Sequence, residues 1–183
     1  MTTAILLLLV LTAIIISICY WGAGIILDPP EKSALEVFPE QFGLRYEKVS
    51  FTTRDGLLLK GWFIPSSTGE KRTILMCHGW GDNKGHLLER TYFLNKEAGF
   101  NLLYFDHRSH GESAGKITTM GYLEMIDCDA AIDFLRAHKP ACLEDLGIFG
   151  LSMGGAVAIM TMSHHPEIKA AVLESPFTDY REV

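Results

Sequence analysis

The residues best suited to chemistry lie in one short segment, 146–155, where an apolar run ends in the pattern Gly-x-Ser-x-Gly. Small residues typical of a closely packed helix follow at once, at 156–160. A strand, a tight turn and a helix in this order form a nucleophile elbow, which presents a serine hydroxyl on a strained turn. The sequence therefore predicts that Ser152 is a nucleophile.

The residues around Ser152 support this interpretation. Gly150 and Gly154 lack the Cβ atoms that would collide as strand and helix approach each other. The free N–H groups at the start of the following helix favour negative charge beside the hydroxyl. The alternative is a merely flexible glycine-rich loop, but a strand on one side and a helix on the other favour the elbow.

A second segment, 78–82, follows an apolar run at 73–77 and reads His-Gly-Trp-Gly-Asp. Loops at the carboxyl ends of parallel strands gather at one edge of a sheet, so this segment is expected beside the elbow. We expect the backbone N–H groups of Trp80 and Met153 to form an oxyanion hole. His78 could serve as a base, but a histidine directly before such a loop is expected to fix the loop by hydrogen bonding.

A third segment, 106–113, contains two histidines, an arginine and two acids within eight residues. Such a cluster suggests a metal site or an acid–base pair, yet metal ligands usually come from several elements and this spacing is not typical of zinc. We therefore predict a structural loop in which Asp106 and Arg108 form an ion pair or a helix cap. No metal and no cofactor is expected.

The remaining sequence predicts the elements that position these loops. Strands are expected at 45–53 and 57–64, joined by a hairpin turn at 54–56, and buried strands at 73–77, 101–105 and 168–173. Amphipathic helices are expected at 86–98 and 119–138. This alternation predicts an α/β fold with a doubly wound, mostly parallel sheet and antiparallel strands at one edge.

The N-terminal segment, residues 4–27, contains no charged side chain and is long enough to cross a bilayer. Tyr20 and Trp21 near its end suit a membrane interface. A cleaved signal peptide is the alternative, but the first three residues contain no Lys or Arg. We predict a single-pass membrane anchor at 4–27, a linker at 28–44 and a catalytic-type domain at 45–183, with the side of the membrane undetermined.

Charge and cysteine content exclude some other classes. The net charge of −6 gives no reason to expect nucleic acid or anionic lipid as a partner. The four cysteines, which form no Cys-x-x-Cys pair, are expected to be small core residues, and disulfides are left open.

Three ordered motifs, His-Gly-x-Gly, Asp-x-Arg-x-His-Gly-x-Ser and Gly-x-Ser-x-Gly-Gly, resemble the α/β-hydrolase superfamily over residues 46–179. The similarity is greatest to its serine aminopeptidase-like branch, which includes membrane-anchored esterases, lipases and thioesterases. The resemblance implies Ser152 as nucleophile, Trp80 and Met153 as oxyanion donors, and a small-molecule, acyl or peptide substrate. It also implies that the turn at 174–179 is a point where a substrate-covering cap is often inserted.

One part of that pattern is missing. The family places an acid and then a histidine after the nucleophile, whereas only 31 residues follow Ser152 here. His164 and His165 would lie about 18 Å away along the helix, and no base follows Asp179. We expect the N-terminal part of a longer serine hydrolase without its C-terminal strands, inert and poorly soluble on its own. The alternative is a catalytically inactive, membrane-tethered binding module.

Overall fold

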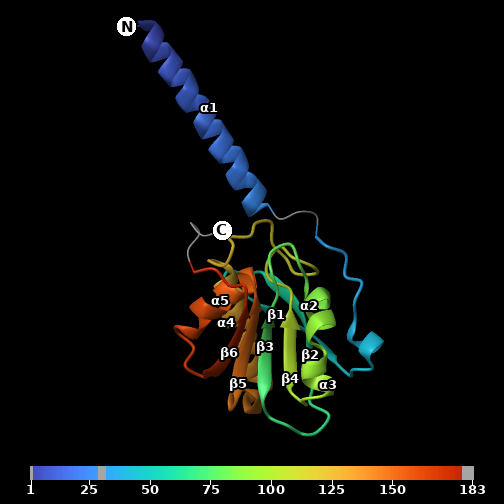
Figure 1. Cartoon of the computed structure of the whole chain (residues 1–183). Helices are drawn as coiled ribbons and strands as arrows, with labels where there is room; N and C mark the ends of the chain where they lie inside the picture. The colour runs from blue at the N-terminus through green and yellow to red at the C-terminus, as the bar shows by residue number, and fades with distance from the viewer. Residues whose placement is uncertain (1, 29–31, 179–183) are drawn as a thin grey trace.

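A computed structural model describes residues 2–28 and 32–178 (Figure 1). Its strands are β1 (Glu47–Thr52), β2 (Leu58–Ile64), β3 (Thr73–Cys77), β4 (Asn101–Phe105), β5 (Leu146–Leu151) and β6 (Ile168–Glu174). Its helices are α1 (Thr2–Leu27), α2 (Lys84–Thr91), α3 (Phe93–Lys96), α4 (Glu124–His138) and α5 (Met153–Met162), with short 3-10 turns η1 (Pro39–Phe42) and η2 (Pro140–Leu143).

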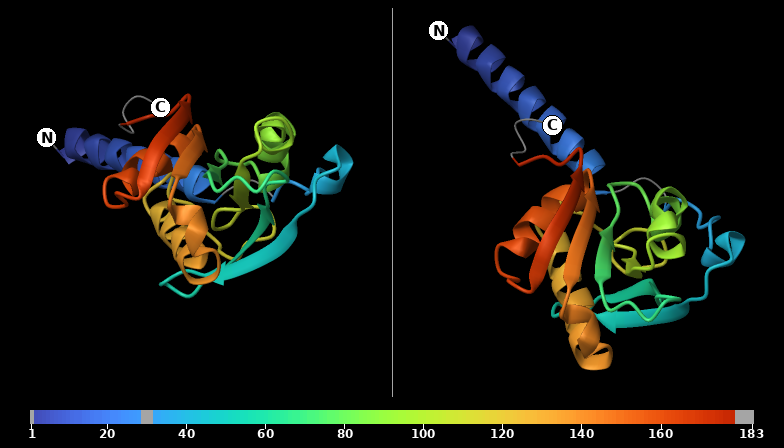
Figure 2. Two further views of the ribbon diagram at one scale, coloured as in Figure 1. Left: turned by 90° about the horizontal axis from the view of Figure 1, so that it is seen from below. Right: turned by 60° about the horizontal axis from the view of Figure 1, so that its bottom comes forward.

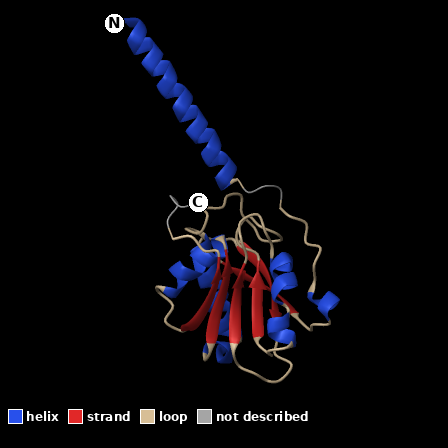
Figure 3. Cartoon of the chain, in the orientation of Figure 1, coloured by secondary structure: helices blue, strands red, loops and turns tan. Residues whose placement is uncertain are grey.

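All six described strands belong to one sheet, in the order β1-β2-β4-β3-β5-β6 (Figure 3). Strands β3, β4, β5 and β6 are parallel to one another, whereas β1 pairs antiparallel with β2, and β2 pairs antiparallel with β4. The prediction of a mostly parallel α/β sheet with antiparallel strands at one edge is therefore confirmed. The sheet brings the loops after β3, β4 and β5 to one edge.

Helices cover both faces of the sheet (Figure 2). On one face α2 and the chain around η1 enclose a core that includes Trp62, Met76, Leu88 and Tyr104. On the other face α4 and α5 pack over a larger core, to which the strands contribute mainly aromatic and aliphatic side chains. Continuous apolar strands require this double coverage, because each presents side chains to both faces.

Strand β6 differs from its prediction. A buried strand was expected, but of its residues only Ile168 is buried, and Val172 is 61% exposed. The reason is that β6 forms an edge of the described sheet, where it pairs with β5 alone. Beside it, an open groove of about 570 Å³ runs between the sheet and α3, and its lining includes Phe93, Phe149 and Val172.

Two helices also begin or end differently from expectation. The single helix expected at 86–98 is divided into α2 and α3, and it starts earlier because the Asn83 side chain caps the N–H groups of Gly85 and His86. The helix expected from 119 begins at Glu124. Met120 and Gly121 before it have φ values of 54° and 125°, which a helix cannot include.

Helix α1 extends away from the sheet on the side where the carboxyl ends of the parallel strands lie (Figure 1). Its segment Thr3–Ile25 is apolar and long enough to span a membrane, and no side chain of this segment is buried in the domain. The backbone N–H of Thr118 donates to the carbonyl of Leu27 at 2.9 Å, which joins the end of α1 to the loop before α4. The same features fit an anchor and a signal sequence.

Candidate active site

Ser152 lies at the tip of the turn between β5 and α5, with φ 52° and ψ −114°. Residues with side chains rarely adopt positive φ, and such strain persists only where the surrounding structure fixes it. Here the backbone N–H of Ser152 donates to the carbonyl of Glu174 on β6, and its carbonyl accepts from Gly155 in the first turn of α5. The backbone of the half-exposed Ser152 is therefore held in place at the carboxyl edge of the sheet.

Close backbone contacts explain the glycines on either side. A Cβ on Gly154 would lie 2.2 Å from the carbonyl oxygen of Cys77 on β3, and one on Gly150 would lie 2.4 Å from the carbonyl oxygen of Gly154. Neither contact can relax by moving a flexible side chain, because backbone atoms lie on both sides. The elbow thus requires glycine at both positions, as the sequence predicts.

The loop after β3 lies against the elbow. A Cβ on Gly79 would stand 3.6 Å from the Cβ of Ser152, which is ordinary van der Waals contact. Trp80 follows in this loop, and Met153 is buried at the first position of α5. The structure therefore places the loop that contains Trp80 against Ser152, with Met153 next to it in the chain, and the catalytic roles of the three residues stay predictions.

His78 and His110 hold this loop in place. His78 is fully buried; its Nδ1 donates to the carbonyl of Gly79, and its Nε2 accepts from the backbone N–H of His107. His110 donates from Nδ1 to the carbonyl of Arg108 and accepts the N–H of Gly81 at Nε2. Both imidazoles are therefore engaged in joining the two loops.

Electrostatics favours the neutral form of both rings. Burial lowers the pKa of His78 well below its usual range, and repulsion by His107 and His110 acts in the same direction. Burial also lowers the pKa of His110, against a smaller opposing effect of its hydrogen bond to Arg108. The expectation that His78 fixes the loop agrees with this geometry, whereas the same role of His110 was not predicted.

The ion pair expected between Asp106 and Arg108 does not exist. Asp106 is fully buried and pairs with the equally buried ammonium group of Lys84, while its Oδ1 accepts the backbone N–H of Lys84 at 2.8 Å. The helix-cap alternative is therefore correct for Asp106, at the start of α2. Both residues lie in the irregular loop after β4, where strand alternation does not hold, and Asp106 reaches Lys84 in α2 while Arg108 reaches Asp127 in α4.

Arg108 is bound by two acids from distant parts of the chain. Its Nε and Nη2 donate to Oδ1 of Asp127 in α4, and its Nη1 donates to Asp55 in the β1–β2 turn at 2.8 Å. Hydrogen bonds from Arg108 are the main cause that lowers the pKa of Asp55. Sequence reasoning missed Asp127 and Asp55, since their separations of 19 and 53 residues carry no local signal.

A general base for Ser152 is not found among the described residues. The Ser152 hydroxyl makes no hydrogen bond within residues 2–28 and 32–178. His164 and His165 lie beyond the far end of α5, where both bind Asp129. Asp179 lies outside the described residues.

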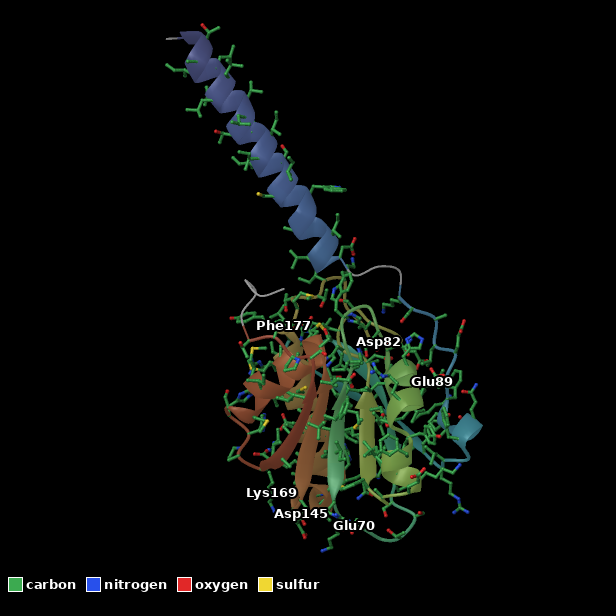
Figure 4. The ribbon with its side chains drawn as sticks, in the orientation of Figure 1. Glu70, Asp82, Glu89, Asp145, Lys169 and Phe177 are labelled. Atoms are coloured by element: carbon green, nitrogen blue, oxygen red, sulfur yellow. The ribbon has the colours of Figure 1, made fainter. Side chains whose placement is uncertain are left out.

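Figure 4 shows how the labelled side chains are distributed between the two ends of the sheet. Asp82 and Phe177 lie at the end that carries the elbow, whereas Glu70, Asp145 and Lys169 lie at the opposite end. Phe177 also packs against the core and, with Met120, lines a small cavity of about 100 Å³ beside Ala156 and Ile159 of α5. The site end therefore combines apolar and polar side chains.

The elbow contact generates a stability prediction. Gly154→Ala places a methyl group against backbone atoms of Cys77 and His78, so we expect it to lower the free energy of unfolding by roughly 3 kcal/mol. Gly147→Ala in β5 is the matched control, because its nearest contact would be 3.4 Å. Urea unfolding measures both, and equal midpoints for the two variants would contradict the packing described here.

The buried pair generates a second prediction. Asp106→Asn removes the buried one of the two carboxylates that pair with Lys84 and leaves only the exposed Glu112, so we expect the free energy of unfolding to fall by about 3 kcal/mol. Asp133→Asn, on the exposed face of α4, removes a carboxylate that pairs with Arg136 at the surface and should change stability little. If Asp106→Asn lowered the free energy of unfolding as little as Asp133→Asn does, the buried pair with Lys84 would not be needed for stability.

Comparisons with known proteins agree with this geometry. The protein YfhR of Escherichia coli is 35% identical over 143 residues, covering 75% of this chain and 49% of YfhR. Protein bem46 of Schizosaccharomyces pombe is 30% identical over 148 residues, covering 79% of this chain and 49% of bem46. The chain thus spans about half the length of these curated relatives.

A crystal structure of an esterase from Pyrococcus furiosus superposes with a TM-score of 0.75 at 34% identity, covering 82% of this chain and 57% of the esterase. The family model described as serine aminopeptidase, S33, matches residues 68–183, which include the loop after β3, the loop after β4 and the elbow. The chain therefore belongs to the serine aminopeptidase S33 family and has an α/β-hydrolase fold.

Proposed function

We propose that this chain carries the nucleophile and oxyanion hole of a serine hydrolase that cleaves an ester, thioester or amide bond. The observation that carries the proposal is the strained backbone of Ser152 at the β5–α5 turn, beside the loop of Trp80. Strain of this kind is retained where a function requires it. Family membership and the similarity to an esterase support hydrolysis as the reaction class.

In the proposed reaction a base takes the Ser152 proton while Oγ attacks the substrate carbonyl carbon. The backbone N–H groups of Trp80 and Met153 stabilise the resulting oxyanion, and Met153 adds the positive end of α5. The tetrahedral intermediate expels an alcohol, thiol or amine, which takes up the proton, and leaves an acyl-enzyme. Water then attacks the acyl group and regenerates the Ser152 hydroxyl.

The supporting loops contribute rigidity to this reaction. The N–H of Gly81 is already bound by His110, and the carbonyl of Gly79 by His78, so the loop of Trp80 need not reorganise when charge develops. Preorganised donors of this kind contribute roughly 3 kcal/mol each to the transition state. The acid and the base of the triad are not among the described residues.

We also propose that residues 4–27 anchor the protein in a membrane, on the basis of the apolar, unburied α1. The carboxyl edge of the sheet then faces the membrane, because α1 leaves from that side (Figure 1). Near this junction Tyr20 and Trp21 of α1 line a cleft of about 860 Å³ together with Trp80. An anchored enzyme would thus present its site toward the bilayer surface.

The nucleophile is tested with a fluorophosphonate probe. We expect the product of the complete reading frame to be labelled, and we expect Ser152→Ala to lose at least about a hundredfold in labelling, because the covalent bond forms at that oxygen. Ser163→Ala, at the exposed far end of α5, is the matched control and should be labelled normally.

Two results would contradict this assignment. Full labelling of Ser152→Ala would place the nucleophile elsewhere. A folded product of the complete reading frame that is never labelled would favour the inactive binding module.

The anchor is tested by alkaline carbonate extraction of membranes. We expect the protein to remain in the pellet with its N-terminal residues intact, since an apolar helix of this length partitions strongly into the bilayer. A variant lacking residues 2–27 should move to the supernatant. An N-terminus beyond Tyr20 in mature wild-type protein would instead identify a cleaved signal peptide.

A further inference from the structure

Three residues with metal-binding side chains meet in the interior beneath the candidate site. Cys77 is the last residue of β3, His107 lies in the loop after β4, and Cys128 lies in α4. All three are fully buried, so they have no contact with solvent. The elements that contribute them are separate in the sequence and are brought together only by the fold.

Their donor atoms have the spacing of a metal site. One ligand atom from each residue lies within 4.8 Å of the other two, and the Sγ atoms of Cys77 and Cys128 are 3.5 Å apart. Two thiolates at about 2.3 Å from a tetrahedral zinc ion stand about 3.8 Å apart. The sulfur atoms therefore need little movement to share one ion.

His107 provides a second, independent observation. Neither nitrogen of its buried ring makes a hydrogen bond among the described residues, although most buried polar atoms are paired. The ring packs against His78 and Phe105 and is not free to turn toward solvent. Its Nδ1 lies 3.6 Å from a carboxylate oxygen of Asp127, beyond hydrogen-bond distance.

We propose that Cys77, His107 and Cys128 supply three ligands to a thiophilic divalent metal ion, Zn²⁺, in a fully buried site. Two thiolates and a neutral imidazole neutralise the ion, so the complex is compatible with an apolar interior. Ligation of one ring nitrogen leaves the other N–H for Asp127, and metal-binding histidines commonly donate to a carboxylate in this way. The ion would thus give a ligand bond to a ring that makes no hydrogen bond among the described residues and has only the longer contact with Asp127.

Two alternatives explain less. A disulfide between Cys77 and Cys128 would require the sulfur atoms to approach to about 2.05 Å and would leave His107 unpaired. The other histidine cluster among the described residues, Asp129 with His164 and His165, lies partly at the surface. Its ring nitrogens are already engaged with Asp129 and Glu167, so no unpaired donor indicates a metal there.

This site was not predicted from the sequence, although the reasoning about where metal ligands come from applies to it. The histidines at 106–113 were assigned to a structural loop because metal ligands usually come from several elements. His107 meets that condition, since its partners come from β3 and α4. The proposal does not depend on the reactivity of Ser152.

The test uses the full chain, produced in zinc-supplemented cells and purified in detergent. We expect about one Zn²⁺ per chain by elemental analysis, and a thiolate-to-metal charge-transfer band when Co²⁺ replaces it. Cys128→Ser and His107→Ala should bind Zn²⁺ at least about tenfold more weakly. Cys142→Ser, which changes a buried cysteine outside the cluster, is the matched control and should bind normally.

A chelator gives a readout independent of metal content. It should lower the melting temperature of wild-type protein and of Cys142→Ser but leave Cys128→Ser unchanged, because only bound metal adds to stability. A folded wild-type chain without zinc and without a cobalt band would overturn the proposal, and this result stands even if Cys128→Ser fails to fold. Mass analysis that shows loss of two hydrogens from Cys77 and Cys128 would overturn it in favour of a disulfide.

Discussion

The arrangement of the site depends on the compensation of charge in the loop after β4. This loop carries Asp106 and Arg108 into the interior, where an isolated ionised group would cost several kcal/mol in lost hydration. Each charge is matched by a partner from another element: Asp106 pairs with Lys84 in α2, and Arg108 pairs with Asp127 in α4. The loop after β4 can therefore be buried only when α2 and α4 are in place to supply Lys84 and Asp127.

That condition has a geometric consequence for the neighbouring loops. Once Asp106 fixes the start of α2, the loop between β3 and α2 is held at both ends. Two bonds then join it to the loop after β4: His110 accepts the N–H of Gly81, and His78 accepts the N–H of His107. The loop then has one conformation against the elbow. A strained serine is retained only beside such a rigid neighbour, because a mobile one would allow the turn to relax.

Much of this was accessible from the sequence because the signals are local. The elbow follows from glycines at fixed offsets from Ser152, and the order of strands follows from apolar runs that alternate with helices. What could not be predicted are partners fixed by tertiary contact. Asp55 and Asp127 meet Arg108 only because the β1–β2 turn and α4 converge on one loop, and neither sequence separation has a preferred pattern.

The helix boundaries also show where a local sequence pattern fails to predict the structure. The start of α4 was misplaced because the periodicity of 119–138 continues through residues whose backbone is not helical. There the carboxylate of Glu124 accepts hydrogen bonds from Thr118, Thr119 and Gly121, which fold the preceding segment into a turn. These bonds outweigh the effect of burial and lower the pKa of Glu124. Local competition by side chains thus overrides a hydrophobic pattern.

The position of the Cys77–His107–Cys128 cluster relates the interior to the site. Cys77 is followed directly by His78, and the ring of His78 accepts the backbone N–H of His107. Small apolar residues at these positions would pack the core but would not join β3, the β4 loop and α4. A shared metal ion would link these three elements directly. It would thus add to the buried ion pairs that already fix the loop after β4.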